Sequence, residues 1–493
     1  MATTHVNWID SVRGRATSGD AKPKAADGLI AFSVMWAVAL IFSTVSHPEL
    51  LMFQRGIKLA LVEYLILAAA LALIVQPRRL ALLLLLAGAM VLQYLFRLPV
   101  ASNNQTIAFF MNCAIVVAVL ATWSKHEGAD LARENAYETL RMVARLLLAT
   151  MYFYGIFHKI NVDFLDPDAS CAVALYRPLT STFGLEDNLV GRYGSIIATF
   201  VLEGIAIVSL FWRRFFAVGL ILALWFHYVI PISAYSWYMD FSSLVFALYT
   251  LSVPREVSVA FHTRTSAILR RVRTPSAGVS ATVALLIGVA ASFALASYLR
   301  AQASDLEVTD LMVWHSTWMV LWAVIGGIAM VLLTWSALAA LPYRPQALPP
   351  VPKWAYVLPG VLFVSCLSPY LGLKTESSIA MFSNLHTEGG TTNHLIITSP
   401  LYIADYQRDV AILTDSSDPS MQDRARRGLG MVRFDLERWF RRHPDDWVSF
   451  TMNGRQFNRT SAATYPLPDY NLIERELLVF KPVDLARPKV CTH

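Results

Sequence analysis

One stretch of the sequence gathers polar side chains at the end of a long apolar run. It reads Tyr152-Phe-Tyr-Gly-Ile-Phe-His158-Lys159-Ile-Asn161-Val-Asp163. On a helix, Tyr152 and Lys159 share one face, and His158 and Asp163 flank it. Burial disfavours the charged form of an amine, so a buried Lys159 is a candidate general base. The alternative is a lysine that extends its ammonium group to the membrane interface and has no chemical role.

The chain does not return directly to water after this stretch. It continues through Phe164, Leu165, Cys171, Ala172 and Leu175. This segment is too polar to span a membrane and too apolar for an ordinary loop. We expect it to fold back over a site.

Other polar residues lie inside or at the mouth of apolar runs. They are Glu203, His227, Asp240 and the sequence Asn103-Asn104-Gln105. Ionisable groups at membrane depth are costly, so such residues are functional candidates by default. Each one alone is more often a hydrogen-bonded packing residue. Because they come from neighbouring runs, we expect several of them, with Tyr152, to line one internal site.

The composition defines the elements that must hold these residues in place. The chain has 493 residues, of which 56% are hydrophobic and 15% charged. Soluble proteins carry roughly 25% charged residues, so a soluble enzyme, a disordered chain and a disulfide scaffold are all excluded. A spanning helix needs about 20 apolar residues. About eleven runs qualify: 29–46, 57–76, 79–98, 106–123, 138–158, 194–212, 214–234, 238–253, 279–298, 316–341 and 354–370.

The basic residues indicate how these runs cross the membrane. The net charge is +6, but lysines and arginines concentrate in alternate short loops, such as Arg78-Arg79 and Arg213-Arg214. This pattern follows the positive-inside rule and requires no nucleic acid. We therefore expect a cytoplasmic N-terminal segment (1–28) and an exoplasmic C-terminal region. The apolar runs, rich in Ala and Leu, fit a bacterial inner (plasma) membrane.

Residues 371–493 differ in composition and contain no run long enough to span. Four short apolar runs predict strands, starting at His394, Val410, Trp447 and Leu477. Val432, Leu436, Trp439 and Phe440 recur at helical spacing in an Arg-rich segment, which predicts one amphipathic helix. Its basic face could be solvated or could touch lipid headgroups. The predicted fold is thus an all-α polytopic membrane protein with a small exoplasmic α+β domain.

Cysteines and short motifs exclude several chemistries. Cys113, Cys171, Cys366 and Cys491 form no CxxC pair and are too scattered for a metal cage, so no metal is expected. A bridge between Cys366 and Cys491 is one arrangement that the sequence leaves open. The chain has no nucleotide-binding glycine motif, no HExxH and no GxSxG. Nucleotide-driven and hydrolytic reactions are therefore disfavoured.

A family resemblance rests on three segments. The run from His158 through Lys159-Ile-Asn-Val-Asp163-Phe-Leu, the later Trp225-Phe226-His227, and Asp240-Phe-Ser-Ser-Leu resemble the horizontally transferred transmembrane (HTTM) domain. That domain is shared with vitamin K-dependent gamma-glutamyl carboxylase. The resemblance covers roughly residues 25–255 and is most specific around Lys159.

The resemblance implies a role for several residues. Lys159 would be the base that deprotonates a reduced naphthoquinone of the vitamin K type, and His158 and His227 would be its polar neighbours. Asn103 and Asn104 look like the Asn-Asn pair that precedes a functional histidine in the carboxylase. Here that position is Gln105, which cannot exchange a proton. The complete carboxylation reaction is therefore in doubt.

Two functional hypotheses follow, for a chain divided into an HTTM/carboxylase-like region (29–255), additional transmembrane helices (256–370) and the exoplasmic domain (371–493). The first is a quinol-dependent membrane enzyme that uses Lys159 to modify an exoplasmic peptide or protein. The second is a membrane scaffold or maturation partner of another protein, in which the polar residues only pack helices. A transporter is a third alternative, but we find no inverted repeat in the sequence.

Overall fold

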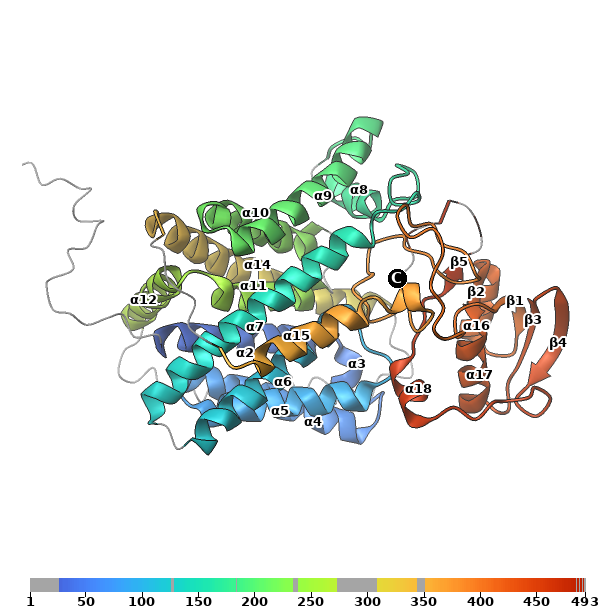
Figure 1. Cartoon of the computed structure of the whole chain (residues 1–493), viewed down its shortest axis with the longest axis horizontal. Coiled ribbons are helices and arrows are strands. Elements are labelled where there is room, and N and C mark those ends of the chain that lie inside the picture. Colours follow the sequence, from blue (N-terminus) through green and yellow to red (C-terminus); the bar gives the residue numbers. More distant parts are fainter. Residues whose placement is uncertain are drawn as a thin grey trace, which may run out of the picture.

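The computed structural model describes residues 26–125, 128–182, 184–233, 238–272, 308–343 and 351–484, with residues 486, 488, 489 and 491. Within these residues the chain is mostly helical, and a small antiparallel sheet follows near its C-terminal end. Figure 1 shows the long helices side by side in a bundle, with the sheet beyond one end of it. We call residues 371–484 the cap.

Eight helices of the described chain are long and apolar enough to cross a membrane. They are α2 (Ala26–Val45), α4 (Ile57–Val75), α5 (Leu80–Arg97), α6 (Asn103–Ser124), α7 (Ala129–Phe157), α9 (Leu189–Phe211), α10 (Phe216–Ser233, preceded by the 3-10 turn η1, Arg213–Phe215) and α14 (Val308–Ala339). Their apolar stretches match the thickness of a bilayer core. The length and apolar composition of these helices therefore indicate an integral membrane protein.

The predicted span 238–253 forms a bent pair of helices. Helix α11 (Met239–Ser252) is buried along its whole length. It meets α12 (Arg255–Val272) at an angle of 117°. Pro254 lies at the bend, where its missing N–H interrupts helical hydrogen bonding. Counted as one span, this pair brings the described total to nine.

For two further predicted spans, the described residues show no helix long enough to cross a membrane. The run 279–298 lies outside the described residues. The run 354–370 is the twelve-residue helix α15 (Trp354–Ser365), followed by the 3-10 turn η4 (Ser368–Leu371). The total of eleven spans therefore stays a prediction.

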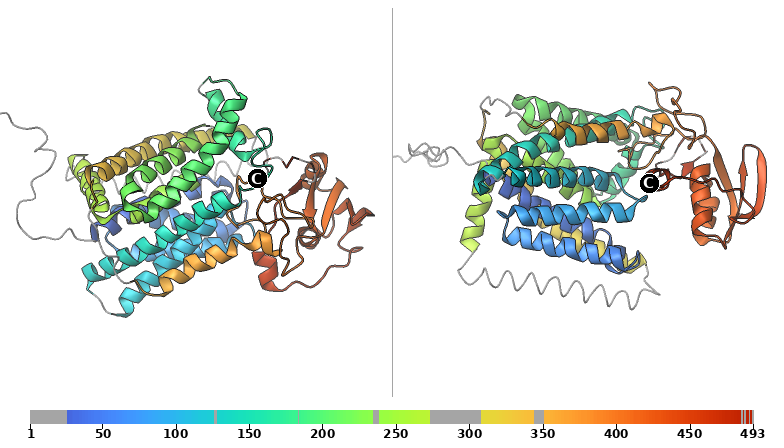
Figure 2. Two further views of the ribbon diagram at one scale, coloured as in Figure 1. Left: turned by 45° about the horizontal axis from the view of Figure 1, so that its top comes forward. Right: turned by 60° about the horizontal axis from the view of Figure 1, so that its bottom comes forward.

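The cap contains one five-stranded antiparallel sheet. Its strands are β1 (Val410–Ser416), β2 (Leu429–Val432), β3 (Trp447–Met452), β4 (Arg455–Ser461) and β5 (Val483–Asp484), in the order β4-β3-β1-β2-β5. Its helices are α16 (Pro419–Arg426), α17 (Arg433–Arg442) and α18 (Leu472–Leu477). The two views of Figure 2 agree that this sheet lies away from the bundle.

Two of the four predicted strands and the amphipathic helix are confirmed. Strands β1 and β3 begin at the predicted residues Val410 and Trp447, and their inward side chains alternate with outward ones. Helix α17 buries Leu436 and Phe440 against Phe450 of β3. The short strand β2 was missed because its four residues are all buried and show no alternation.

The other two predicted strands are wrong. At 394–398, the Nδ1 atom of His394 accepts hydrogen bonds from the backbone N–H groups of Ile396 and Ile397, so these groups cannot join a ladder. Only one isolated bridge, between Asn161 and His394, forms there. The predicted strand at 477–480 does not form, and its first residue, Leu477, is the last residue of helix α18. A capping box of Asn471 and Glu474 starts this helix.

Candidate functional site

A cavity of about 420 Å³ lies between helices α7, α9 and α10 and the short helix α8 (Cys171–Thr182). This volume falls within the roughly 300–1,000 Å³ of small-molecule sites. Most of the lining side chains are apolar, among them Ile107, Met151, Phe164, Leu202, Phe226 and Ile230. Lys159, Glu203, His227, Tyr152 and Asn103 also line it. These five of the predicted residues thus line one cavity.

Lys159 and Glu203 form an ion pair on the cavity wall. Lys159 lies two residues beyond α7 and is only 6% exposed. Its Nζ atom donates to Oε1 of Glu203 in α9 at 2.5 Å. Gly155, one turn before Lys159, leaves room for this carboxylate, because a Cβ atom there would lie 3.0 Å from Oε2 of Glu203. The amine is therefore buried inside the protein with a partner.

His227 faces the same cavity from α10. Its Nε2 atom lies 3.5 Å from the hydroxyl of Tyr152, a long contact, and Tyr249 donates to that hydroxyl at 3.3 Å. The Nδ1 atom of His227 and the Oε2 atom of Glu203 are buried and have no hydrogen-bond partner within the described residues. A buried polar atom without a partner is costly. Both residues line the cavity, so its wall includes two side chains that each carry a polar atom without a partner in the described chain.

The cap closes one side of the cavity. Ile379, Met381 and Phe382 line it from the cap. The side-chain oxygen of Asn103, at the start of α6, accepts a hydrogen bond from the backbone N–H of Ile379 at 2.6 Å. Sequence reasoning missed these three cap residues, because nothing in their local pattern indicates which distant helix end they cover.

Helix α8 confirms the expectation that the segment after Lys159 folds back over a site. Its residues Ala172, Leu175 and Tyr176 line the cavity. The helix begins at Cys171, which forms a disulfide with Cys491. The bridge that the sequence left open, between Cys366 and Cys491, is therefore wrong: Cys366 is a free, buried cysteine. Cys171 was not considered as its partner because the two residues are 320 positions apart.

His158 and Asp163 lie beside the cavity and join the cap to the bundle. The Nδ1 atom of His158 accepts from the Tyr370 hydroxyl at 2.8 Å, and its Nε2 atom donates to the carbonyl of Ser378 at 3.0 Å. Asp163 accepts from Nδ2 of Asn393 at 2.6 Å and from the backbone N–H of Lys489 at 3.1 Å. Neither side chain lines the cavity. Their contacts are those of structural residues.

Asn104 and Asp240 belong to a second polar group, also away from the cavity lining. Nδ2 of Asn104 donates to Oδ2 of Asp240 at 2.5 Å. Nε2 of His47 lies 3.7 Å from the same oxygen and 3.1 Å from Nε2 of Gln105. The sequence signal for His47, a histidine directly after the first apolar run, was overlooked. Asn103 and Asn104 are adjacent in sequence but serve different sites.

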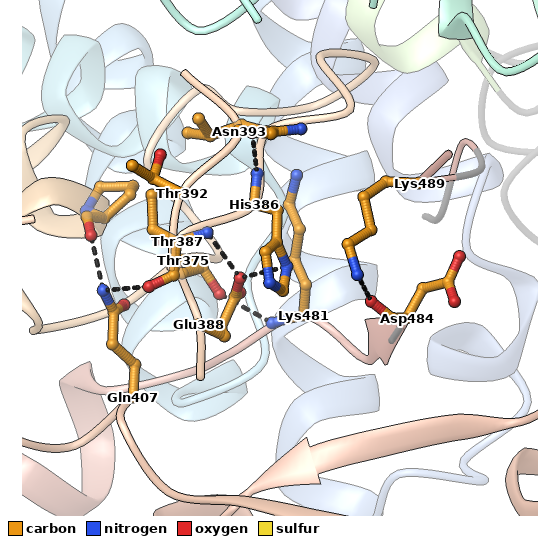
Figure 3. Close-up of polar contacts among 12 residues, drawn as sticks. Thr375, His386, Thr387, Glu388, Thr392, Asn393, Gln407, Lys481, Asp484 and Lys489 are labelled. Atoms are coloured by element: carbon orange, nitrogen blue, oxygen red, sulfur yellow. Dashed lines mark hydrogen bonds and ion pairs between the residues drawn. The ribbon is translucent and has the colours of Figure 1, made fainter. Parts of the chain in front are cut away.

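The cap holds a third polar group, drawn in Figure 3. Its centre is Glu388, whose Oε2 atom lies 3.2 Å from Nδ1 of His386 and accepts from the backbone N–H of Thr387 at 2.9 Å. Burial raises the pKa of Glu388, but the hydrogen bonds and the charge of His386 outweigh burial and lower it to about 2. Lys481 is buried nearby and donates to the carbonyl of Ala380 at 2.6 Å. Burial lowers the pKa of Lys481.

Metal binding has no support in the described part of the chain. No group of three or more His, Cys, Asp or Glu side chains there is arranged to hold a metal ion. Glu388 and His386 form a pair with a single carboxylate and a single imidazole, and the side chains of Thr375 and Lys481 and the N–H of Thr387 lie around Glu388. This group stabilises the cap.

Comparisons with known proteins add no assignment. No family model, no curated protein and no solved structure matches the chain. The function has to be argued from the cavity and its residues.

Proposed function

We propose that this chain is an integral-membrane enzyme that binds a small, largely apolar molecule in the cavity and uses Lys159 as a base toward it. The observation that supports this proposal most directly is the Lys159–Glu203 pair on the wall of an apolar cavity of about 420 Å³. Ion pairs buried in apolar surroundings are costly to maintain. A catalytic role gives a reason for one at this place.

A reduced naphthoquinone, the molecule implied by the resemblance to the HTTM domain, is the proposed cofactor. It is a flat apolar ring system with two hydroxyl groups, and it would supply an acidic proton and reducing electrons. Glu203 Oε2 and His227 Nδ1 offer the cavity two unpartnered polar atoms. Lys159 and Glu203 would receive the hydroxyl proton, and His227 would orient the ring.

The identity of the acceptor is a separate part of the proposal. Gln105 donates through Nε2 to Nε2 of His47 and accepts through Oε1 from the backbone N–H of Ser102, and it does not line the cavity. We therefore propose oxidation of the quinol by molecular oxygen, to the quinone epoxide and water, coupled to modification of a peptide or protein on the cap side. We do not extend the proposal to carbon dioxide.

We further propose a bacterial inner membrane location with the cap exoplasmic. The distribution of lysines and arginines supports this orientation. The Cys171–Cys491 disulfide supports it independently, because disulfides persist in oxidising compartments and are rare in the cytosol.

The experiment is quinol oxidation by the purified protein in nanodiscs, with the oxidised and epoxide products followed by mass spectrometry. Wild type is compared with Lys159→Ala and with Lys58→Ala, which changes an exposed lysine at the start of α4. We expect turnover by wild type and Lys58→Ala and a loss of at least 100-fold in Lys159→Ala, the usual range for a general base. Equal turnover in all three proteins would refute the role of Lys159.

The scaffold hypothesis is favoured by one specific observation. The Lys159–Glu203 bond joins α7 to α9 across 44 sequence positions, which is what a helix-packing contact does. In that case the protein would copurify with a stable partner, and no quinone would bind or turn over. A naphthoquinone that binds in the cavity and is oxidised by the isolated protein would exclude this alternative.

A further inference from the structure

Two short segments of the cap expose large aliphatic side chains. The first, residues 395–403, exposes Leu395, Ile396, Leu401 and Ile403, by 48, 64, 69 and 64%. The second is α18, which exposes Leu472, Ile473 and Leu477 by 65, 69 and 50%. Contiguous exposed apolar surface in a water-facing region marks a site of interaction.

The first segment is fixed at the level where apolar helices end. The backbone N–H of Leu395 donates to the carbonyl of Ile160 at 2.9 Å, three residues beyond the end of α7. The N–H groups of Leu401 and Ile403 donate to the carbonyls of Tyr370 and Leu371, at 2.8 and 3.1 Å, in the turn η4 that follows α15. Since three residues reach at most about 10 Å, the segment lies within about that distance of the end of the apolar helix α7.

The same contacts orient the apolar side chains outward. The Nε2 atom of His394 donates to the carbonyl of Phe157, the last residue of α7, at 2.9 Å. Its Nδ1 atom also accepts from the N–H groups of Ile396 and Ile397. With the backbone held by this turn, Leu395 and Ile396 remain exposed.

Helix α18 is held near the same level. The carbonyl of Val479, two residues after α18, accepts from the N–H groups of Thr375 and Glu376 at 3.2 and 3.0 Å, shortly after η4. The hydroxyl of Tyr406, three residues after the first segment, donates to Glu474 of α18. Figure 1 shows α18 on the side of the cap that faces the bundle.

We propose that residues 395–403 and α18 insert their aliphatic side chains into the lipid leaflet on the cap side of the membrane. The occupant of this surface is the acyl-chain region next to the headgroups, because the surface continues from the ends of the apolar helices α7 and α15. Arg475, exposed on α18 between these aliphatic residues, is placed to contact a lipid phosphate. The cap is therefore held to the membrane at two points besides its covalent connection. This proposal does not depend on the proposed enzymatic function.

The first test uses the unaltered chain in nanodiscs that contain a phosphatidylcholine with a photoactivatable group on its acyl chain. After irradiation, labelled peptides are identified by mass spectrometry. We expect labelling of residues 395–403 and 472–477 as well as of the apolar helices, and none of β1, which lies in the sheet away from the bundle (Figure 2). Absence of label from both cap segments, or crosslinks there to a second copy of the chain, would overturn the proposal.

The second test places a fluorophore on single cysteines in a chain in which the free cysteines Cys113 and Cys366 are replaced by alanine. Ile396→Cys and Ile473→Cys are compared with Ile412→Cys, an equally aliphatic residue of β1 that is 41% exposed. Lipids that carry a nitroxide near the headgroup should quench the first two labels at least threefold more than the third. Equal quenching at all three positions would overturn the proposal, whatever the outcome of the quinol assay.

Discussion

Nζ of Lys159 lies 2.5 Å from Oε1 of Glu203, so the candidate base of the cavity forms a buried ion pair with a carboxylate from another helix. The other oxygen of Glu203 has no partner in the described chain. Variants that lack one partner or both can therefore separate the contribution of the pair to protein stability from its proposed role in catalysis.

Removing Lys159 alone should destabilise the protein more than removing both partners. Lys159→Met leaves a buried carboxylate without a counter-ion, at a cost of about 3–5 kcal/mol. The double variant Lys159→Met, Glu203→Leu replaces the pair by apolar groups and should recover most of this loss. Thermal unfolding in detergent measures the difference. Lys58→Met, on the exposed surface, is the control. A double variant as unstable as the sum of both single variants would contradict this account.

His227→Phe should weaken quinone binding without unfolding the protein. Phenylalanine keeps the ring between Phe226 and Phe241 but removes the Nδ1 atom that has no partner in the described residues. Loss of one hydrogen bond to the ligand corresponds to about 1.4 kcal/mol, or roughly a tenfold rise in Kd. Quenching of tryptophan fluorescence by a naphthoquinone measures the affinity. His443→Phe, in the cap, should bind as wild type does. Unchanged affinity in His227→Phe would remove His227 from the site.

The sequence predicted the parts of the structure that local physics determines. Most of the predicted apolar runs within the described residues are long helices, because a bilayer requires about 20 apolar residues per span. Lys159, Glu203 and His227 were identified because ionisable side chains are rare in such runs. Helix α17 was predicted from the regular spacing of Leu436 and Phe440.

Long-range contacts could not be predicted in the same way. The hydrogen bond between Asp163 and the N–H of Lys489 joins residues 326 positions apart, and the one between Asn103 and Ile379 spans 276 positions. Neither pairing leaves a local pattern, so Asp163 was expected in the cavity and Ile379 was not considered. Helix geometry points the adjacent side chains of Asn103 and Asn104 in different directions. Their partners, Ile379 and Asp240, are distant in sequence and could not be predicted from it.

Cys491→Ser should loosen the contact between the C-terminal residues and α8. The Cys171–Cys491 disulfide closes a loop of 320 positions, and loss of a native disulfide typically costs about 2–5 kcal/mol. Asn384 reinforces the same contact, because its side chain bonds the N–H of Cys171 and the carbonyl of Lys489.

We therefore expect a lower thermal unfolding temperature and faster proteolysis of the C-terminal residues in Cys491→Ser. Cys366→Ser, which removes a free cysteine, is the matched control. Mass spectrometry of unreduced peptides should find Cys171 joined to Cys491. A Cys366–Cys491 peptide would contradict the structure.

Acid should weaken the cap through Glu388. Its pKa is about 2 in the folded protein against an ordinary value of 4.5, because the His386 contact and the Thr387 N–H outweigh the effect of burial. The folded state thus holds this proton less tightly than the unfolded state does. The stabilisation is complete above pH 4.5 and is lost as the pH falls toward 2. A shift of this size corresponds to about 3 kcal/mol.

Glu388→Gln tests this assignment, because the amide keeps the shape of the side chain but cannot ionise. Urea unfolding of the cap, followed by the fluorescence of Trp439 and Trp447, should show a loss of stability at pH 7 and a flatter dependence on pH between 4.5 and 2. Asp469→Asn changes an exposed carboxylate of the cap and should reproduce the wild-type profile. If Glu388→Gln instead keeps the full acid sensitivity, the titrating group lies elsewhere, and the His386–Glu388 contact does not set the acid stability of the cap.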